Sequence, residues 1–197
     1  MVERARSIEG YTKESELELL LRLAESMPAG AVVVEVGSFR GRSTVAIAEG
    51  LRSVAGARLI AVDTFAGDPG WSEIADVSEA RRLFDHNTSE IDFIDVIQAE
   101  SVRAAAQVAD GSIDWVFIDA LHDYRSVRAD IRAWAPKVRP GGLISGHDYG
   151  RAGVTDAVLA VFSDVQVEQS IWTTRQRPRR RPTRLLRMLV RRLIRGS

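Results

Sequence analysis

Short apolar runs rich in β-branched residues recur along the first 175 residues of the chain. The clearest run covers residues 31–34 and is followed directly by an acidic residue and a glycine-containing stretch. Runs of this length and composition are typical of strands that are buried on both faces of a parallel sheet. The pattern predicts five such strands, at residues 31–34, 58–62, 93–98, 112–119 and 143–146.

Between these runs, hydrophobic residues recur every three or four positions, which predicts amphipathic helices. The predicted helices cover residues 13–26, 78–86, 101–106, 127–134 and 154–162, and a further helix is capped by Ser43 or Thr44. Two short segments, 165–168 and 170–174, predict a hairpin at the sheet edge. The order predicts an α/β fold, a doubly wound, Rossmann-like sheet of seven strands that is mostly parallel with a terminal antiparallel hairpin and has helices on both faces.

The composition limits the classes of protein to consider. At 197 residues and 45% hydrophobic residues, the chain can form one sizeable core, and we assign residues 1–174 to one domain. Cysteine is absent, which excludes disulfides and thiolate metal sites. The charged first ten residues differ from a signal peptide, and no apolar stretch is long enough to span a bilayer. We therefore expect a soluble cytoplasmic protein.

The zero net charge of the chain conceals an uneven distribution. Ten of the 27 basic residues are arginines between Arg175 and Arg195, so residues 1–174 carry 17 basic and 27 acidic residues, a net charge of −10. In residues 175–197 apolar residues recur at helical spacing among the arginines, which predicts a basic amphipathic tail. Such a tail can contact a membrane surface, pair with another subunit, approach nucleic acid or have no role. The acidic body disfavours nucleic acid.

A glycine loop follows the first predicted strand and identifies the kind of ligand. Gly37 and Gly41 permit a tight turn and a close backbone approach. Loops that bind a dinucleotide have two further glycines so that the backbone can reach the pyrophosphate, and here Phe39 and Arg42 occupy those positions. S-adenosylmethionine has no phosphate and tolerates the looser pattern, so the loop favours this cofactor over a nicotinamide.

Side chains that can bind ligands follow each predicted strand. Because the carboxyl ends of parallel strands lie at one edge of a sheet, these side chains are expected to converge there. Asp63 occupies the position at which nucleotide-binding sheets place an acid for ribose hydroxyls, and a solvent-exposed loop acid is the alternative. The set consists of Glu35, Asp63, Glu100 with Ser101, Asp119, and His147 with Asp148.

Several segments together resemble class I S-adenosylmethionine-dependent methyltransferases, and most closely the small bacterial O-methyltransferases that include antibiotic-sugar enzymes. The most specific are FID-x-x-H-x-Y, which contains Asp119, and GGLI-x-GHDY, which contains His147 and Asp148. The segments IEGYT, VVEVGSFRGRST and AVDTFAGD also match, in order and with suitable gaps. The resemblance covers roughly residues 8–174 and implies a seven-stranded methyltransferase sheet.

This resemblance implies roles for the residues of the cofactor site. Glu35, Gly37 and Gly41 would hold the methionine part of S-adenosylmethionine, Asp63 its ribose, and Ser101 would lie beside the adenine. The complete predicted cofactor-binding set is Glu35, Gly37, Ser38, Gly41, Ser43, Asp63, Thr64, Ser101 and Asp119.

A divalent cation is also implied by the resemblance. Its ligands would be Asp119 and Asp148, at the ends of the fourth and fifth strands. His147 stands where several such enzymes have a further acid, and we include it in the predicted metal set as a weak ligand or a supporting residue. Mg²⁺ prefers carboxylate and water oxygens, whereas an imidazole also suits Mn²⁺ or Zn²⁺.

Methylation of a hydroxyl requires removal of its proton, and histidine titrates close to neutral pH. His122 lies three residues after Asp119, and we predict that it is the general base, with Asp119 as the second catalytic residue. A loop histidine that hydrogen-bonds Asp123 is the alternative. His86 is the second candidate for the base, and Tyr124 and Tyr149 line the pocket or pack against the domain.

The predicted function is methylation of a hydroxyl on a small molecule such as a sugar, a glycosylated natural product or a lipid. The alternatives are an RNA methyltransferase that uses the basic tail, an NAD-dependent oxidoreductase and a non-catalytic binding domain with the same fold. The segment 64–90, which includes Trp71, is expected to shape acceptor choice. Oligomeric state stays open, with a homo-oligomer as one option.

Overall fold

Seven strands form one sheet in the order β3-β2-β1-β4-β5-β7-β6 within residues 2–67 and 79–177, which the computed structural model describes. The first five strands in this order are parallel, whereas β7 runs antiparallel to β5 and β6 antiparallel to β7. The prediction of a mostly parallel sheet with a terminal antiparallel hairpin is confirmed. The strands are β1 (Val32–Val36), β2 (Arg58–Asp63), β3 (Ile94–Gln98), β4 (Ile113–Ile118), β5 (Val138–Gly146), β6 (Gln166–Glu168) and β7 (Ile171–Arg175).

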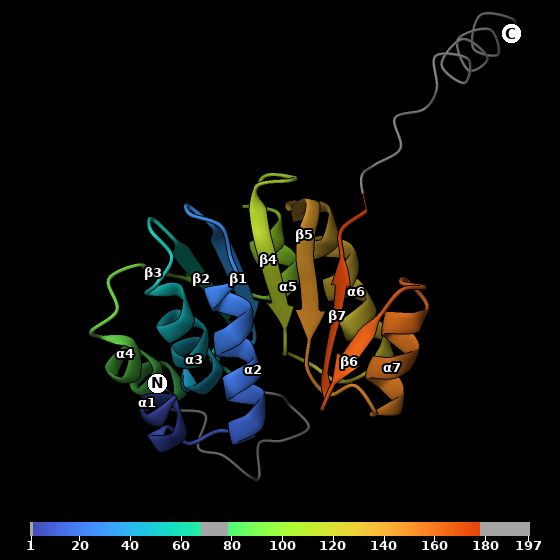
Figure 1. The fold of residues 1–197 in the computed structure, drawn as a ribbon. Helices are drawn as coiled ribbons and strands as arrows, with labels where there is room; N and C mark the ends of the chain where they lie inside the picture. The colour runs from blue at the N-terminus through green and yellow to red at the C-terminus, as the bar shows by residue number, and fades with distance from the viewer. Residues whose placement is uncertain (1, 68–78, 178–197) are drawn as a thin grey trace, which may run out of the picture.

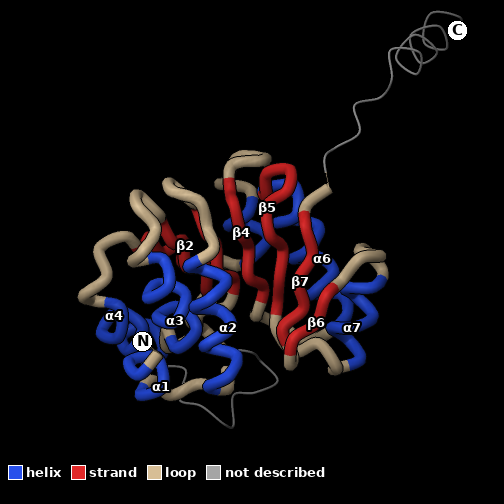
Figure 2. Tube along the Cα trace, viewed as in Figure 1, coloured by secondary structure: helices blue, strands red, loops and turns tan. Residues whose placement is uncertain are grey.

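Helices cover both faces of this sheet (Figure 1). One layer contains α1 (Glu3–Ser7), α2 (Glu14–Glu25), α3 (Arg42–Leu51) and α4 (Ala80–Thr88), and the other contains α5 (Ser101–Ala105), α6 (Tyr124–Trp134) and α7 (Ala152–Leu159). A 3₁₀ turn, Ala135–Lys137, joins α6 to β5. The tube in Figure 2 shows the same layers, with loops gathered at the two ends of the strands.

Alternation along the strands divides the core into two parts. Trp115 and Phe117 of β4 face α2 and α3, whereas Val116 and Ile118 face α6 and α7. Trp115 and Phe117 are fully buried, and burial of a side chain of this size stabilises the fold by roughly 1.5–3 kcal/mol. Both faces of the central strands are therefore apolar, as the uninterrupted hydrophobic runs predicted.

Two local predictions were wrong. The fifth strand was predicted to begin at residue 143, but β5 begins at Val138, and Pro140, Gly141 and Gly142 lie inside it at a shift of register against β4. Gly141 has a φ of 82°, and a proline is tolerated at such an irregularity because no ladder hydrogen bond depends on it. In α3 the N-cap is Gly41, with a φ of 89°, and not Ser43 or Thr44. The Thr44 hydroxyl instead donates to the carboxylate of Glu35.

Arg42, at the start of α3, attaches the N-terminal segment to the rest of the domain. Its guanidinium donates to the backbone carbonyls of Thr12 at 2.8 Å, Arg6 at 2.8 Å and Ile8 at 2.6 Å. One side chain thus satisfies several carbonyls of an otherwise irregular segment. The residue that replaces a glycine of the dinucleotide pattern therefore has a structural role that the sequence did not reveal.

We expect Arg42→Ala to lower the free energy of unfolding by roughly 2–4 kcal/mol, because two half-buried carbonyls and one exposed carbonyl lose a charged donor. Urea unfolding measures the change, and limited proteolysis should show earlier cleavage within residues 1–12. Arg52→Ala is the matched control, since Arg52 lies just after the same helix and pairs with Glu49 at the surface. Equal urea midpoints for the two variants would contradict this role.

The described chain ends at Arg177, after β7. β7 is antiparallel to β5, with Arg175 opposite Leu143. The last described residues therefore lie near the amino ends of the parallel strands, away from their carboxyl ends (Figure 1). The predicted amphipathic helix of the tail, Trp71, and Ser78 at the start of a predicted helix lie outside the described residues. The contacts proposed for the tail therefore stay predictions.

Within residues 2–67 and 79–177, no helix combines the length and the apolar character that a membrane crossing requires.

Candidate active site

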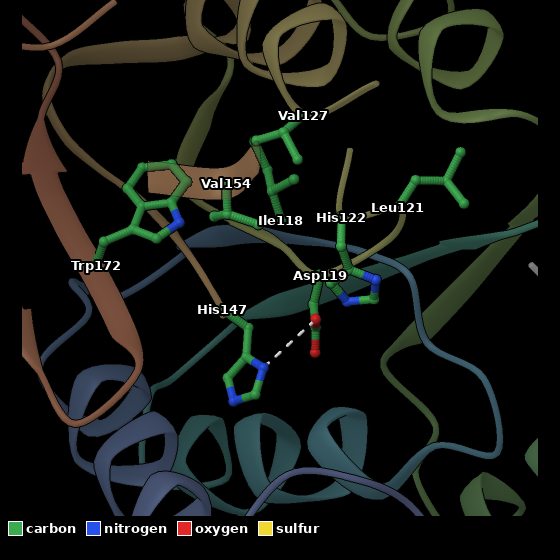
Figure 3. A pocket seen from close by; sticks show the side chains of 8 residues that line it. All are labelled: Ile118, Asp119, Leu121, His122, Val127, His147, Val154 and Trp172. Atoms are coloured by element: carbon green, nitrogen blue, oxygen red, sulfur yellow. Dashed lines mark ion pairs between the residues drawn. The ribbon is translucent and has the colours of Figure 1, made fainter. Parts of the chain in front are cut away.

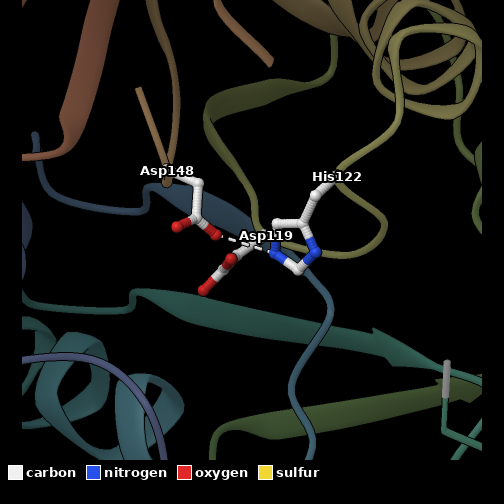
Figure 4. Close-up of side chains that lie close together, drawn as sticks. All are labelled: Asp119, His122 and Asp148. Atoms are coloured by element: carbon white, nitrogen blue, oxygen red, sulfur yellow. Dashed lines mark ion pairs between the residues drawn. The ribbon is translucent and has the colours of Figure 1, made fainter. Parts of the chain in front are cut away.

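Two aspartates and two histidines meet where β4 and β5 end. Asp119 follows β4 directly, and His147 and Asp148 follow the last residue of β5. One side-chain oxygen or nitrogen from each of Asp119, His122 and Asp148 lies within 4.8 Å of the others (Figure 4). The structure therefore brings together the acids that were predicted to bind a metal, as expected from the parallel pairing of β4 with β5.

The loops after these strands have little freedom. A Cβ atom on Gly146 would lie 2.5 Å from the carbonyl oxygen of Ile118, so β4 and β5 approach closely just before the aspartates. Asp148 has a φ of 59°, and its carboxylate accepts hydrogen bonds from His122 Nε2 at 2.7 Å and from Arg151 Nε at 3.0 Å. These contacts set the direction of the Asp148 side chain.

His147 connects the aspartates to the first layer of helices. Its Nδ1 lies 3.7 Å from Asp119 Oδ1 (Figure 3) and 3.4 Å from Asp148 Oδ2. Its Nε2 lies 3.1 Å from a carboxylate oxygen of Glu16. Asp119, His122 and His147 also line a small pocket with apolar walls. The other lining residues are Ile118, Leu121, Val127, Val154 and Trp172.

Glu16 is a site residue that the sequence analysis missed. It lies in the first turn of α2, is fully buried and accepts hydrogen bonds from the backbone N–H of Lys13 at 2.8 Å and from the Ser170 hydroxyl. Glu16 precedes Leu19 and Leu20 by three and four residues, so it lies on the apolar face of the helix. An acid on the buried face of a helix was the available signal.

Glu35, which was predicted to follow the first strand, lies inside β1 and is fully buried. The Thr44 hydroxyl of α3 donates to one oxygen of its carboxylate, and the hydroxyls of Ser38 and Ser43 lie nearby. Within the described residues, neither Glu35 Oε1 nor Ser38 Oγ has a hydrogen-bond partner. Burial raises the pKa of Glu35 to about 7, and the hydroxyls offset part of this effect. The acid therefore lies beneath the loop and supports it.

Gly37 joins this loop to the pair of aspartates. It has a φ of 91°, and a Cβ atom at this position would lie 2.1 Å from the carbonyl oxygen of Asp119. Only glycine fits in such a position. The glycine loop and the end of β4 are thus in direct backbone contact, which places the predicted cofactor site beside the predicted metal site.

Asp63 accepts hydrogen bonds from three backbone N–H groups. Ser38 N and Phe39 N donate to one carboxylate oxygen and Phe65 N to the other, each at 2.7 Å. The oxygen that accepts only from Phe65 N can accept a second hydrogen bond, so these contacts leave room for one ribose hydroxyl. The Thr64 hydroxyl, in contrast, accepts from Ala66 N and lies at an exposed position.

The remaining predicted residues lie farther from the aspartates. The Ser101 hydroxyl accepts from Trp134 Nε1 at 3.0 Å and contacts the buried Asp130, whose pKa burial raises to about 6. Ser101 follows β3, and Ala99 N donates to the Asp63 carbonyl, so the two predicted cofactor positions lie in neighbouring loops. His86 lies in α4, and Tyr124 begins α6 with its side chain exposed.

Residues 34–149 match the profile of a protein family described as a methyltransferase domain. The chain belongs to this methyltransferase family. Among curated proteins, it is 26% identical over 117 residues to the uncharacterized protein y4gI of Sinorhizobium fredii, a match that spans 59% of this chain and 13% of that protein. The match therefore covers a small part of a much longer relative.

Solved structures share the fold of this methyltransferase. Cofactor-bound Rv0187 from MTB superposes with a TM-score of 0.64 at 18% identity, over 89% of this chain and 86% of that one. The O-methyltransferase NovP has a TM-score of 0.63 at 18% identity, over 82% and 79%. CalS11, a TDP-rhamnose 3′-O-methyltransferase of calicheamicin biosynthesis, has a TM-score of 0.56 at 17% identity, over 83% and 81%. The predicted class I methyltransferase fold is confirmed.

The two aspartates of the methyltransferase site have pKa values that are shifted in opposite directions. Burial raises the pKa of Asp119. Burial acts in the same direction on Asp148, but hydrogen bonds from His122 and His147 outweigh it and hold its pKa well below the usual range. Burial lowers the pKa of His147, but the hydrogen bonds with Asp148 and Glu16 and the charges of Asp119 and Asp148 outweigh this effect and raise it to about 9.

This donor set fits a divalent cation. Two carboxylates from different strands converge with imidazole nitrogens at a partly buried position, and positive charge is favourable between the two acids. The adjacent loop fits a cofactor that approaches the backbone at Gly37 and presents a positive group near Glu35.

Proposed function

We propose that this methyltransferase transfers a methyl group from S-adenosylmethionine to a hydroxyl oxygen of a small molecule, with a divalent cation held by Asp119 and Asp148. The observation that carries the proposal is the backbone contact between Gly37 and Asp119. Through this contact, the loop of the cofactor site and the acids of the cation site share one edge of the sheet.

On the cofactor side, the glycine loop between β1 and α3 would receive the methionine part. Glu35 lies beneath this loop and supplies the negative charge that a cationic amino acid end requires. Asp63 would accept a hydrogen bond from one ribose hydroxyl while it retains its three backbone donors. The adenine would lie toward Ser101. The whole set is Glu35, Gly37, Ser38, Gly41, Ser43, Asp63, Thr64, Ser101 and Asp119.

On the acceptor side, Asp119 and Asp148 would hold Mg²⁺ or another divalent ion. When bound, such an ion lowers the pKa of a neighbouring hydroxyl and fixes its oxygen in position. The residues of the chain provide the orientation, because Asp148 is held by His122 and Arg151 and Asp119 is held by the contact of its backbone with Gly37.

His122 is the candidate general base. It would accept the hydroxyl proton as the oxygen forms a bond to the methyl carbon and the carbon–sulfur bond breaks, leaving methylated product and S-adenosylhomocysteine. Asp148, 2.7 Å from His122 Nε2, would stabilise the imidazolium that results. His122 also lies close enough to both aspartates to bind the ion, so base and ligand are competing roles for this residue.

The acceptor class is proposed from the site and its structural relatives. The two acids suit a divalent cation, beside which a hydroxyl of the acceptor would be held. NovP and CalS11, by their names, are O-methyltransferases, and CalS11 acts on a sugar. We therefore favour a hydroxyl of a sugar or a glycosylated natural product.

Removal of the ion is expected to abolish transfer without loss of the cofactor. We expect EDTA-treated protein to transfer less than about 1% of the label from methyl-labelled S-adenosylmethionine to a panel of glycosides, and Mg²⁺ or Mn²⁺ to restore transfer. Calorimetry should show the same affinity for S-adenosylhomocysteine with and without EDTA, to within about threefold. Full transfer in excess EDTA would contradict the role of the cation, and labelling of RNA alone would contradict the acceptor class.

A further inference from the structure

We propose that Glu16 of α2 is a positioning residue that fixes the ring of His147, so that His147 Nδ1 is a third ligand to the cation beside Asp119 and Asp148. This inference rests on the proposed function, because it concerns the same cation. It adds a residue from the first layer of helices, more than 100 positions away in the sequence, and it specifies which nitrogen of His147 faces the ion.

The burial of Glu16 requires an explanation. Its side chain has no exposed surface, and within the described residues no lysine or arginine forms an ion pair with it. A buried carboxylate is costly unless hydrogen bonds and an opposite charge compensate for the lost water. The backbone N–H of Lys13, the Ser170 hydroxyl and His147 Nε2 provide this compensation. His147 is thus the only charged partner of Glu16 among the residues described.

The directions of the hydrogen bonds show that Nε2 of His147 carries a hydrogen. An ionised Glu16 can only accept, so the Ser170 hydroxyl donates its proton to it. The Ser170 oxygen, 3.1 Å from His147 Nε2, can then only accept from the ring. Because Glu16 lies at the same distance of 3.1 Å from this nitrogen, Nε2 must carry the hydrogen.

With its hydrogen on Nε2, His147 directs Nδ1 toward Asp148 at 3.4 Å and Asp119 at 3.7 Å. This nitrogen donates to Asp148 when the ring is protonated, and a divalent cation between the three groups would take the place of that proton. A carboxylate behind a histidine that binds a metal is a common arrangement, and it orients the ring and raises the basicity of the other nitrogen. Glu16, His147 and the ion would form such a chain.

A nitrogen ligand changes the preference of the site among ions. Imidazole suits Mn²⁺ and Zn²⁺, whereas Mg²⁺ prefers oxygen. We therefore expect the wild-type protein to bind Mn²⁺ at least about tenfold more tightly than Mg²⁺. His122 is the competing source of nitrogen, because it also lies within reach of both aspartates.

The decisive variant is Glu16→Gln in the full chain. The amide oxygen is expected at the place of Oε2, because this one oxygen accepts from Lys13 N and lies 3.1 Å from His147 Nε2. The amide nitrogen then faces Ser170, and His147 loses the negative charge behind its ring. We expect the affinity for Mn²⁺, measured by electron paramagnetic resonance of the free ion, to fall by about 10- to 100-fold, and the affinity for Mg²⁺ to change by less than about threefold. Glu18→Gln, in the same helix but exposed and paired with Arg6, should behave as wild type.

The ring nitrogens provide a second readout that does not depend on turnover. In Zn²⁺-loaded protein labelled with ¹⁵N-histidine, His147 should show a protonated Nε2 and a metal-bound Nδ1, with His86 as an internal reference. Ser170→Ala, which retains Glu16, should lower Mn²⁺ affinity by a smaller factor of about threefold and tests the same chain if Glu16→Gln fails to fold.

The outcomes separate this inference from the proposed function. Unchanged Mn²⁺ affinity in Glu16→Gln, or a metal-bound His122 with an unbound His147, would overturn the role of Glu16 and leave the cation site in place. If wild-type protein bound neither Mn²⁺ nor Mg²⁺, the proposed cation itself would fail.

Discussion

Asp119→Asn and Asp148→Asn are each expected to lower methyl transfer by at least about 10³-fold, and Asp148→Asn, which lies outside the proposed cofactor set, is expected to bind S-adenosylhomocysteine within about threefold of wild type. A bound divalent ion supplies several kcal/mol of stabilisation to the developing oxygen charge, and an amide in place of either carboxylate removes most of the attraction that holds the ion. Asparagine has the shape of aspartate and tolerates the left-handed backbone of Asp148, which has a φ of 59°. The variants should therefore remain folded.

Single-turnover transfer of a labelled methyl group measures the chemical step, and calorimetry measures cofactor binding. Asp156→Asn is the matched control, because Asp156 lies on the exposed side of α7. If either variant retained more than about a tenth of wild-type transfer, the two aspartates would not hold a catalytic ion. If cofactor binding by Asp148→Asn fell in parallel with transfer, Asp148 would support the cofactor loop and not the chemistry.

Glu35→Gln is expected to stabilise the cofactor-free protein at alkaline pH and to weaken its binding of S-adenosylmethionine. Burial raises the pKa of Glu35 from 4.5 to about 7, so the folded protein retains a proton that the unfolded chain releases between these values. Stability therefore falls as pH rises from about 4.5 to 7, and above 7 the full cost of roughly 3 kcal/mol applies. Glutamine is neutral throughout and avoids this cost.

Urea unfolding at pH 5 and pH 8.5 tests the stability half of this prediction. The variant should be more stable than wild type by roughly 2–3 kcal/mol at pH 8.5, and the difference should shrink below about 1 kcal/mol at pH 5. At pH 8 the affinity for S-adenosylmethionine should fall at least about tenfold, since the buried negative charge is lost. Glu25→Gln, at the exposed end of α2, is the control. Equal pH dependence in wild type and Glu35→Gln would show that Glu35 is ionised at low cost.

The opposite effects on stability and binding have one physical cause. A carboxylate that is desolvated beneath a ligand loop costs folding energy, which is offset only when a positive group binds above it. Thr44 and the neighbouring hydroxyls reduce this cost but do not remove it. A residue with only a structural role would be expected to weaken folding when changed, and not to strengthen it.

The local pattern of hydrophobic residues was sufficient to predict the layers of strands and helices in this protein. Uninterrupted apolar runs predicted the five parallel strands, because a strand covered by helices on both faces excludes polar side chains. The parallel order then predicted that Asp119 and Asp148 would meet at one edge, and they do. Boundaries were less reliable, as at β5, where pairing with β4 extends the strand through a proline and two glycines.

The sequence by itself determined the fold class, the glycine loop and the convergence of two aspartates, since these depend on periodicity and on the direction of parallel strands. Only the tertiary structure decided the partners of the buried charges. Glu16 and Arg42 look in the sequence like ordinary polar residues of helices, yet one is buried against His147 and the other binds the carbonyls of the N-terminal segment. Such contacts join residues far apart in the chain, and no local pattern encodes the distance between them.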